Sequence, residues 1–231
     1  MNKKVLYGIG VLAILCVAAF VALGFVGKTE EKNPLVVENN PPVSETGAWT
    51  TVKDGVYAVS VSESRVGWEG KKTLIKDYVD TGTLAIKEGS IRVSEGDVTA
   101  EIVFDMTSIK THSTGSGKGE SGLERHLKSD DFFSVEAFPT SVFLVERVVP
   151  LDNEAHSYTA TGKLTIKGIT NEISVPVLLY ESDGAVRVDG TVLIDRTKWD
   201  IRFGSDKFFD NLANNVIDDF FSVSFSLLAR Q

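Results

Sequence analysis

Apolar and polar residues alternate along most of the chain after residue 55. The clearest example is a pair of adjoining runs in which the positions between the apolar residues are mostly Thr, Lys, Glu or Ser. A period of two with one polar face predicts an antiparallel hairpin that packs one face on a core. The apolar positions of the two runs are Tyr158, Ala160, Gly162, Leu164 and Ile166, followed by Ile173, Val175, Val177 and Leu179.

The same alternation predicts further strands before and after this hairpin. About eight to ten strands at this spacing favour an all-β fold, and we expect an extended antiparallel β-barrel of about eight strands rather than a sandwich. The other predicted strands lie at 57–61, 66–68, 84–86, 91–93, 98–106, 142–148, 186–194 and 221–227.

Small residues interrupt the inward-facing series at Ala100, Ala160, Gly162 and Gly190. A barrel of about eight strands is just wide enough to be filled by side chains or to hold one slender ligand. The small residues therefore predict an interior cavity; the alternative is that they mark bulges or tight corners in a packed core. Counting parity along the strands, we expect the ligand to contact Ala100, Ile102, Phe104, Phe143, Ala160, Gly162, Leu164, Val175, Val177, Val192, Phe221 and Phe225.

Residues 108–133 break the strand pattern. The glycine-rich stretch 111–119 predicts a flexible loop, and Ser121 with Glu124 predicts a capping box at the start of a short helix. Leu123 and Leu127 lie four residues apart on one face of that helix, which ends near Ser129. We expect the helix to cover the mouth of the barrel as a lid.

The N-terminal segment contains 22 uncharged residues, 5–26, after Lys3 and Lys4. A helix of this length spans about 33 Å, enough for a bilayer core, and the lysines favour a cytoplasmic N-terminus. We predict a transmembrane anchor or signal segment (1–27), a flexible linker (28–50) and a barrel domain (51–231). The segment is an uncleaved anchor, a cleaved signal or a lipoprotein signal acylated at Cys16. Each alternative predicts an extracytoplasmic domain, membrane-anchored and periplasmic or at the cell surface, or secreted after cleavage.

Composition excludes several function classes. With 24 Lys and Arg against 32 Asp and Glu, the net charge of -8 argues against nucleic acid or an anionic membrane as the main partner. The only cysteine lies in the N-terminal apolar segment, and the three histidines lack metal-ligand spacing. We therefore predict no metal site and no cofactor.

Catalytic motifs are incomplete in this sequence. Residues 115–118, Gly-Ser-Gly-Lys, lack the first glycine and the final Ser or Thr of a phosphate loop. The stretch 119–123 ends in Leu123 where a nucleophile elbow requires glycine. The acidic pairs 130–131 and 218–219 lie at element boundaries, where we expect ion pairs with Arg125, Arg196 or Arg202 rather than acid-base chemistry. The chain is not predicted to be an enzyme.

An ordered series of motifs resembles the YceI-like family. These motifs are 126–133 (HLKSDDFF), 138–140 (FPT), 161–170 (TGKLTIKGIT) and 194–197 (IDRT), within a resemblance that covers roughly 55–229. The resemblance implies a lipocalin-like antiparallel barrel that binds a polyisoprenoid or similar long amphiphile and has no known catalytic activity. The sequence departs from the family pattern at Ser60, Glu63 and Asp200, a difference that bears on head-group recognition more than on fold.

The sequence thus predicts a membrane-tethered, extracytoplasmic binding protein for a polyisoprenoid or other long-chain lipid. One alternative is a protein-interaction module whose barrel is filled by its own side chains. A lipid-modifying enzyme is the weakest alternative, because the inward positions carry no polar group apart from the hydroxyls of Tyr57 and Tyr158. The identity of the lipid and the oligomeric state are not specified by the sequence.

Overall fold

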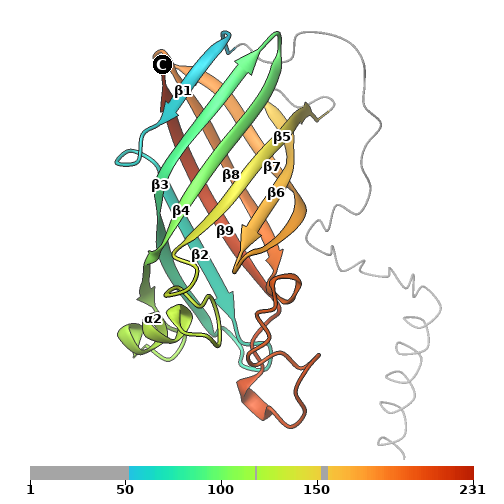
Figure 1. Ribbon diagram of the computed structural model, residues 1–231. Coiled ribbons are helices and arrows are strands. Elements are labelled where there is room, and N and C mark those ends of the chain that lie inside the picture. The colour runs from blue at the N-terminus through green and yellow to red at the C-terminus, as the bar shows by residue number, and fades with distance from the viewer. Residues whose placement is uncertain (1–51, 118, 152–155) are drawn as a thin grey trace, which may run out of the picture. The chain divides into compact units, whose positions relative to one another are not determined.

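The computed structural model describes residues 52–117, 119–151 and 156–231. In this part of the chain the dominant element is one antiparallel sheet, rolled so that its two edges meet (Figure 1). The predicted N-terminal span and linker lie outside the described residues. No helix in the described part is both long enough and apolar enough to cross a bilayer.

Nine strands form the sheet, and their order is β1-β3-β2-β9-β8-β7-β6-β5-β4, with further pairings of β1 with β9 and of β3 with β4. The strands are β1 (Gly55–Val59), β2 (Arg65–Lys71), β3 (Val79–Ser94), β4 (Asp97–Ser113), β5 (Thr140–Pro150), β6 (Ser157–Ile166), β7 (Ile169–Ser182), β8 (Ala185–Asp195) and β9 (Phe220–Arg230).

One position in the barrel is shared by two short strands. β1 pairs with residues 90–93 of β3 and 229–230 of β9, whereas β2 pairs with 79–83 of β3 and 222–226 of β9. Both run antiparallel to the same two neighbours, so β1 and β2 are the two halves of one interrupted strand. The nine strands therefore make an eight-stranded antiparallel barrel, as the alternation predicted.

Strand β4 extends beyond the predicted range 98–106. The sequence pattern missed this extension because a bulge changes which positions, even or odd, point inward. Val98, Ile102 and Met106 are buried at even positions, but Ile109 and Thr111 are buried at odd ones. Between the pairs Ala85↔Asp105 and Thr83↔Lys110, four β4 residues lie opposite a single β3 residue, and the three extra residues break the register with β3. The predicted loop at 111–119 is therefore wrong in its first part, where β4 continues to Ser113.

The helix α2 (Glu120–Lys128) is present, but its predicted capping box is not. Gly119 occupies the N-cap with φ of 88°, and no side chain caps the helix. The Glu124 carboxylate instead accepts hydrogen bonds from Lys110 Nζ at 3.0 Å and Lys128 Nζ at 3.2 Å. The two ammonium groups satisfy this carboxylate more strongly than a backbone N–H would. Helix α2 ends next to Ser129, as predicted.

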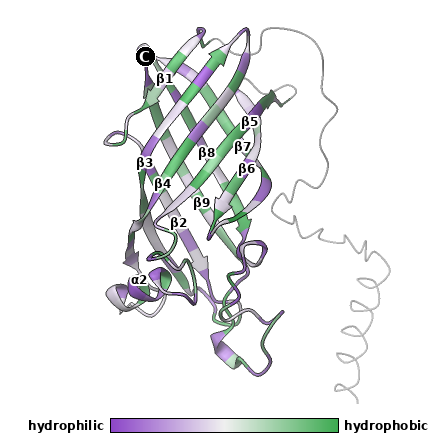
Figure 2. Ribbon diagram, in the orientation of Figure 1, coloured by the Kyte–Doolittle hydropathy of each residue, from purple (hydrophilic) through white to green (hydrophobic). Residues whose placement is uncertain are grey.

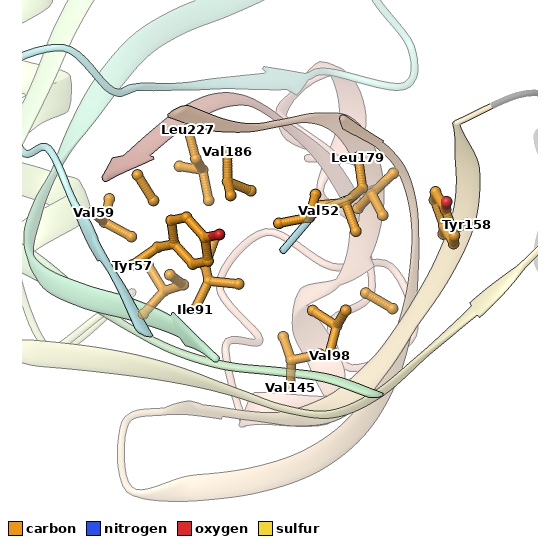
Figure 3. Close-up of a cluster of buried hydrophobic side chains, with 14 of the residues drawn as sticks. Val52, Tyr57, Val59, Ile91, Val98, Val145, Tyr158, Leu179, Val186 and Leu227 are labelled. Carbon is orange, nitrogen blue, oxygen red and sulfur yellow. The ribbon is translucent and has the colours of Figure 1, made fainter. Parts of the chain in front are cut away.

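The two ends of the barrel differ. At the β1 end, buried side chains fill the lumen: Val52, Tyr57 and Val59 lie inside the ring of strands (Figure 3), and the Tyr57 hydroxyl donates to Lys53 O at 2.8 Å. At the other end lie α2, the β2–β3 turn and the long connection between β8 and β9 (Figure 1). Apolar residues alternate with polar ones along the strands between these ends (Figure 2).

Candidate functional site

A cavity of about 760 Å³ occupies the barrel interior. Several side chains that point inward, such as Phe104, Phe143 and Phe225, are only partly buried although they pack against the core. Their remaining exposure is toward this interior space. The cavity falls within the roughly 300–1,000 Å³ of small-molecule sites in proteins.

The wall of the cavity is apolar along the strands. Its strand residues include Val66, Leu84, Ile91, Val98, Ala100, Ile102, Phe104, Phe143, Val145, Ala160, Leu164, Val175, Val177, Leu179, Val188, Val192, Phe221, Val223, Phe225 and Leu227. These apolar residues offer no partner for a charged group, and the part of the wall that they form fits a hydrocarbon chain.

Eleven of the twelve residues predicted to contact a ligand line this cavity, and Gly162 does not. Those on the wall are Ala100, Ile102, Phe104, Phe143, Ala160, Leu164, Val175, Val177, Val192, Phe221 and Phe225. Whether they bind a ligand stays a prediction, but the structure brings them together around one space.

Gly162 corrects the interpretation of the small residues. A Cβ on Gly162 would collide with the carbonyl oxygen of Leu144 and come within 2.7 Å of Val145 Cα. Strands β5 and β6 approach closely here, next to a register shift between Val145 and Arg147. Glycine is therefore required by a β-bulge, the alternative that the sequence left open, and it does not enlarge the cavity.

The other small residues divide between the two interpretations. Ala100 and Ala160 lie on the cavity wall, where larger side chains would occupy the interior. Gly190 pairs with Phe225 on β9, and a Cβ there would lie 2.5 Å from Phe225 Cζ. The glycine thus makes room for an aromatic ring that itself lines the cavity.

The lid helix contributes one face to the site. Leu123, His126 and Leu127, spaced i, i+3 and i+4, all line the cavity. The His126 ring packs edge-on against Phe132 at 4.9 Å and against Phe203, from the β8–β9 connection, at 4.6 Å between ring centroids. Helix α2 and the β8–β9 connection therefore meet at the mouth of the barrel.

Arg196 organises the β8–β9 connection from a buried position. Its guanidinium donates to the carbonyl oxygens of Ile201 and Phe203, at 2.9 and 2.8 Å, and to those of Ile217 and Asp218, both at 3.0 Å. These bonds tie the two ends of the connection together. Burial lowers the pKa of Arg196, while nearby carboxylates, Asp219 foremost, act against that change.

Asp219 forms ion pairs with Arg196 and with Lys207, and we call these three side chains the anchor of the β8–β9 connection. Its carboxylate lies 3.5 Å from Arg196 Nη2 and 2.9 Å from Lys207 Nζ. Burial alone would raise the pKa of Asp219, but hydrogen bonds from Lys207 and Ser205 and the nearby positive charges lower it overall. The ion pair expected between this acidic pair and Arg196 is confirmed.

Polar groups in the cavity gather at the mouth. Lys72 Nζ lies 5.0 Å from the centroid of the Tyr78 ring, and Asp80 accepts a hydrogen bond from Gly115 N at 2.9 Å. Burial raises the pKa of Asp80 despite that bond and the charge of Lys72. The remaining polar residues of the lining are Lys71, His126, Ser141, Arg196, Asn215 and Asp218.

Sequence reasoning missed part of this mouth. Residues of the β8–β9 connection that line it, such as Ile201, Leu212 and Asn215, follow no period. The wall residues that were missed, such as Val145 and Val223, lie at inward positions of predicted strands, where the same parity count would have found them. No cluster of metal-ligating side chains occurs in residues 52–117, 119–151 and 156–231.

The barrel has known structural relatives. It resembles the crystal structure of BcnA from Burkholderia cenocepacia with a TM-score of 0.56 and 22% identity, covering 74% of this chain and 98% of that one. It also resembles a polyisoprenoid binding domain from Saccharophagus degradans implicated in plant cell wall breakdown. That match has a TM-score of 0.54 and 17% identity, and covers 75% and 97% of the two chains.

At these identities the structural matches concern the fold alone. No curated protein sequence matches the chain. The profile of the YceI-like domain, however, matches residues 57–229, which include every strand of the barrel except the first two residues of β1 and the last residue of β9. The chain belongs to the YceI-like family.

Proposed function

We propose that this protein is an extracytoplasmic, membrane-tethered binding protein that holds a polyisoprenoid or other long-chain amphiphile inside its barrel. The observation that carries the proposal is the apolar cavity of about 760 Å³. A methylene group needs about as much room as a water molecule, ~30 Å³, so the cavity accommodates a chain on the order of 20 carbons.

The energetics of burial agree with a binding role. Burying about ten methylene-sized groups contributes roughly 8 kcal/mol before the costs of ordering the ligand. Micromolar affinity requires about 8.2 kcal/mol after those costs. A chain on the order of 20 carbons contributes roughly 16 kcal/mol at the same value per group, so it reaches that range even after part of the gain is lost. The polar residues at the mouth provide hydrogen-bonding partners for a head group, while the tail lies against the wall.

Two further facts support the proposal. The relative from Saccharophagus degradans is described as a polyisoprenoid binding domain. In this chain the uncharged segment 5–26, preceded by Lys3 and Lys4, supports tethering with the barrel outside the cytoplasm. The alternative of a barrel filled by its own side chains is disfavoured, because the interior is hollow.

The test is occupancy of the purified full-length protein, measured by native mass spectrometry before and after addition of geranylgeraniol. We expect a co-purified lipid or uptake of the probe. Ala160→Phe adds a ring on the cavity wall and should lower occupancy at least about tenfold, because the added side chain fills space that the tail needs.

The matched control is Leu144→Phe, which adds a ring on the neighbouring strand at an outward-facing, exposed position. This variant should bind as the parent protein does. Absence of any co-purified lipid together with no uptake of geranylgeraniol would contradict the proposed function.

A further inference from the structure

Exposed aromatic residues gather at the mouth of the barrel. Among the described residues, every exposed phenylalanine belongs to the α2–β5 connection, the β8–β9 connection or the first position of β9. All of these segments lie at the α2 end (Figure 1). The exposed residues are Phe138, Phe203, Phe208, Phe209 and Phe220, and Leu74 joins them from the β2–β3 turn.

Leu74 and the four phenylalanines from 203 to 220 form what we call the apolar rim. The β2–β3 turn and the β8–β9 connection are joined by the bridge between Lys72 and Ile217 and by the hydrogen bond from Thr73 N to Val216 O, 3.2 Å long. The rim therefore comes from two segments that contact each other. In contrast, the turns at the opposite end that contain Glu95-Gly96 and Asp183-Gly184 are polar.

The rim continues the cavity onto the surface. Phe203 and Phe209 are each at least 40% exposed and also line the cavity, so one apolar surface runs from the interior to the outside. The backbone N–H groups of Phe208 and Phe209 donate to Ser205 O, and Ser205 is fully buried. The two rings thus project from an anchored turn.

Two cations beside the rim are paired within the protein. Arg202 pairs with Asp200 at 2.6 Å and lies 4.8 Å from the Phe208 ring centroid. Lys207 pairs with Asp219 and lies 6.0 Å from the ring of Phe220. With these two cations paired and a net charge of -8 for the chain, the rim suits insertion into lipid by its uncharged rings rather than attraction to anionic head groups.

We propose that the apolar rim docks on a lipid bilayer surface, so that the cavity opens directly to the membrane from which its cargo comes. The proposal rests on the proposed function. Cargo then passes from one apolar environment to another without crossing water. This matters because exposing a long hydrocarbon chain to water is unfavourable.

The length of the chain before the barrel permits this orientation. Residues 27–51 number 25 and span at most about 85 Å. The longest strand, β4, has 17 residues and a length of roughly 56 Å. A chain anchored through its N-terminal segment therefore has enough length for the far end of the barrel to turn toward the same membrane.

The first experiment measures the rate at which the full-length protein takes up radiolabelled geranylgeraniol from phosphatidylcholine vesicles and from detergent micelles. Leu74→Asp with Phe208→Asp changes two rim residues that do not line the cavity. We expect uptake from vesicles to slow roughly tenfold or more, because charged side chains do not enter the bilayer. Uptake from micelles should be unchanged.

The matched control is Leu144→Asp with Leu178→Asp, on the outer wall of the barrel at comparable exposure. Its rates should equal those of the parent protein. Equal slowing in the rim and wall variants, or no slowing in the rim variant, overturns the docking proposal.

A second experiment does not depend on cargo. A polarity-sensitive fluorophore is attached to Leu74→Cys or Asp183→Cys in a Cys16→Ser background of the full-length protein, and phosphatidylcholine vesicles are added. A blue shift at position 74 alone, insensitive to salt, supports docking. Three results overturn docking. The first is no shift of the label at position 74. The second is a shift that requires phosphatidylglycerol and is lost in salt, and the third is a shift without lipid, caused by self-association. Docking without uptake from micelles would refute the proposed function instead.

Discussion

At the scale of single residues, glycines in the barrel have different reasons to be small. Gly162 lies against the backbone of β5, so even one additional carbon has no space there. Gly70 on β2 has no neighbouring atom within 4 Å of the position a Cβ would take. The two residues have the same chemistry but different surroundings, and they predict opposite responses to the same change.

We expect Gly162→Ala to lower the free energy of unfolding by about 1–3 kcal/mol or more, since the backbone of two strands has to move apart. Gly70→Ala should change it by less than about 0.5 kcal/mol. Urea denaturation followed by fluorescence measures both. If the two variants are equally stable, the close approach of β5 and β6 is not the reason for Gly162.

This example also shows what the sequence supports at residue level. Parity along a strand correctly placed Ala160 and Leu164 on the cavity wall, because alternation is a local property. It failed at Gly162, because a bulge on the partner strand is a non-local feature that leaves no mark in the alternation of β6 itself. The sequence is compatible with both interpretations of a small inward residue, an enlarged cavity or a bulge, and it does not distinguish between them.

At the scale of elements, the strands were predictable and the β8–β9 connection was not. The strands repeat a pattern, whereas the connection is held by Arg196, which bonds to four carbonyl groups brought together only in the folded chain. Sequence reasoning identified Arg196 as an ion-pair partner for the acidic pair. Its larger role, fixing the segment that carries Phe203 and Phe209, required the structure.

The hydrogen bonds to Asp219 from Lys207 and Ser205, together with the charges of Lys207 and Arg196, predict an acid-sensitive anchor. The pKa of Asp219 is lower in the folded protein than in the unfolded chain, so its contribution to stability is present above about pH 4 and is lost as the pH falls through the folded pKa. Asp219→Asn should cost about 3 kcal/mol at pH 7, because it removes the only carboxylate that pairs with both the buried Arg196 guanidinium and Lys207 in the described residues. The cost should shrink at pH 3, as measured by chemical denaturation at both values.

Asp80 provides a control, because its pKa is shifted in the opposite direction to that of Asp219. Burial raises its pKa, so the ionised form is disfavoured by folding, and the resulting penalty appears as the pH rises through the folded pKa. Asp80→Asn should therefore be neutral or stabilising at pH 7, with the advantage disappearing at low pH. The same pH dependence in both variants would contradict the assignment of Asp219 as the anchor.

At the scale of the whole molecule, binding and stability are linked. A ligand at 100 times its Kd stabilises the folded state by about 2.7 kcal/mol, which for a chain of this size raises Tm by roughly 5–10 °C. We expect this shift with geranylgeraniol, measured by differential scanning calorimetry. Ala160→Phe should abolish the shift while Leu144→Phe keeps it; equal shifts in both variants would mean that the probe binds elsewhere.

The closed β1 end has a consequence for transport. Because Val52, Tyr57 and Val59 fill the lumen there, a molecule that enters tail first departs head first along the same route. Loading and unloading are then one reversible reaction, and the barrel itself imposes no direction on it. If the barrel holds cargo as proposed, net movement of that cargo between two compartments depends only on how readily each compartment donates and accepts it, because a cavity open at one end adds no direction of its own.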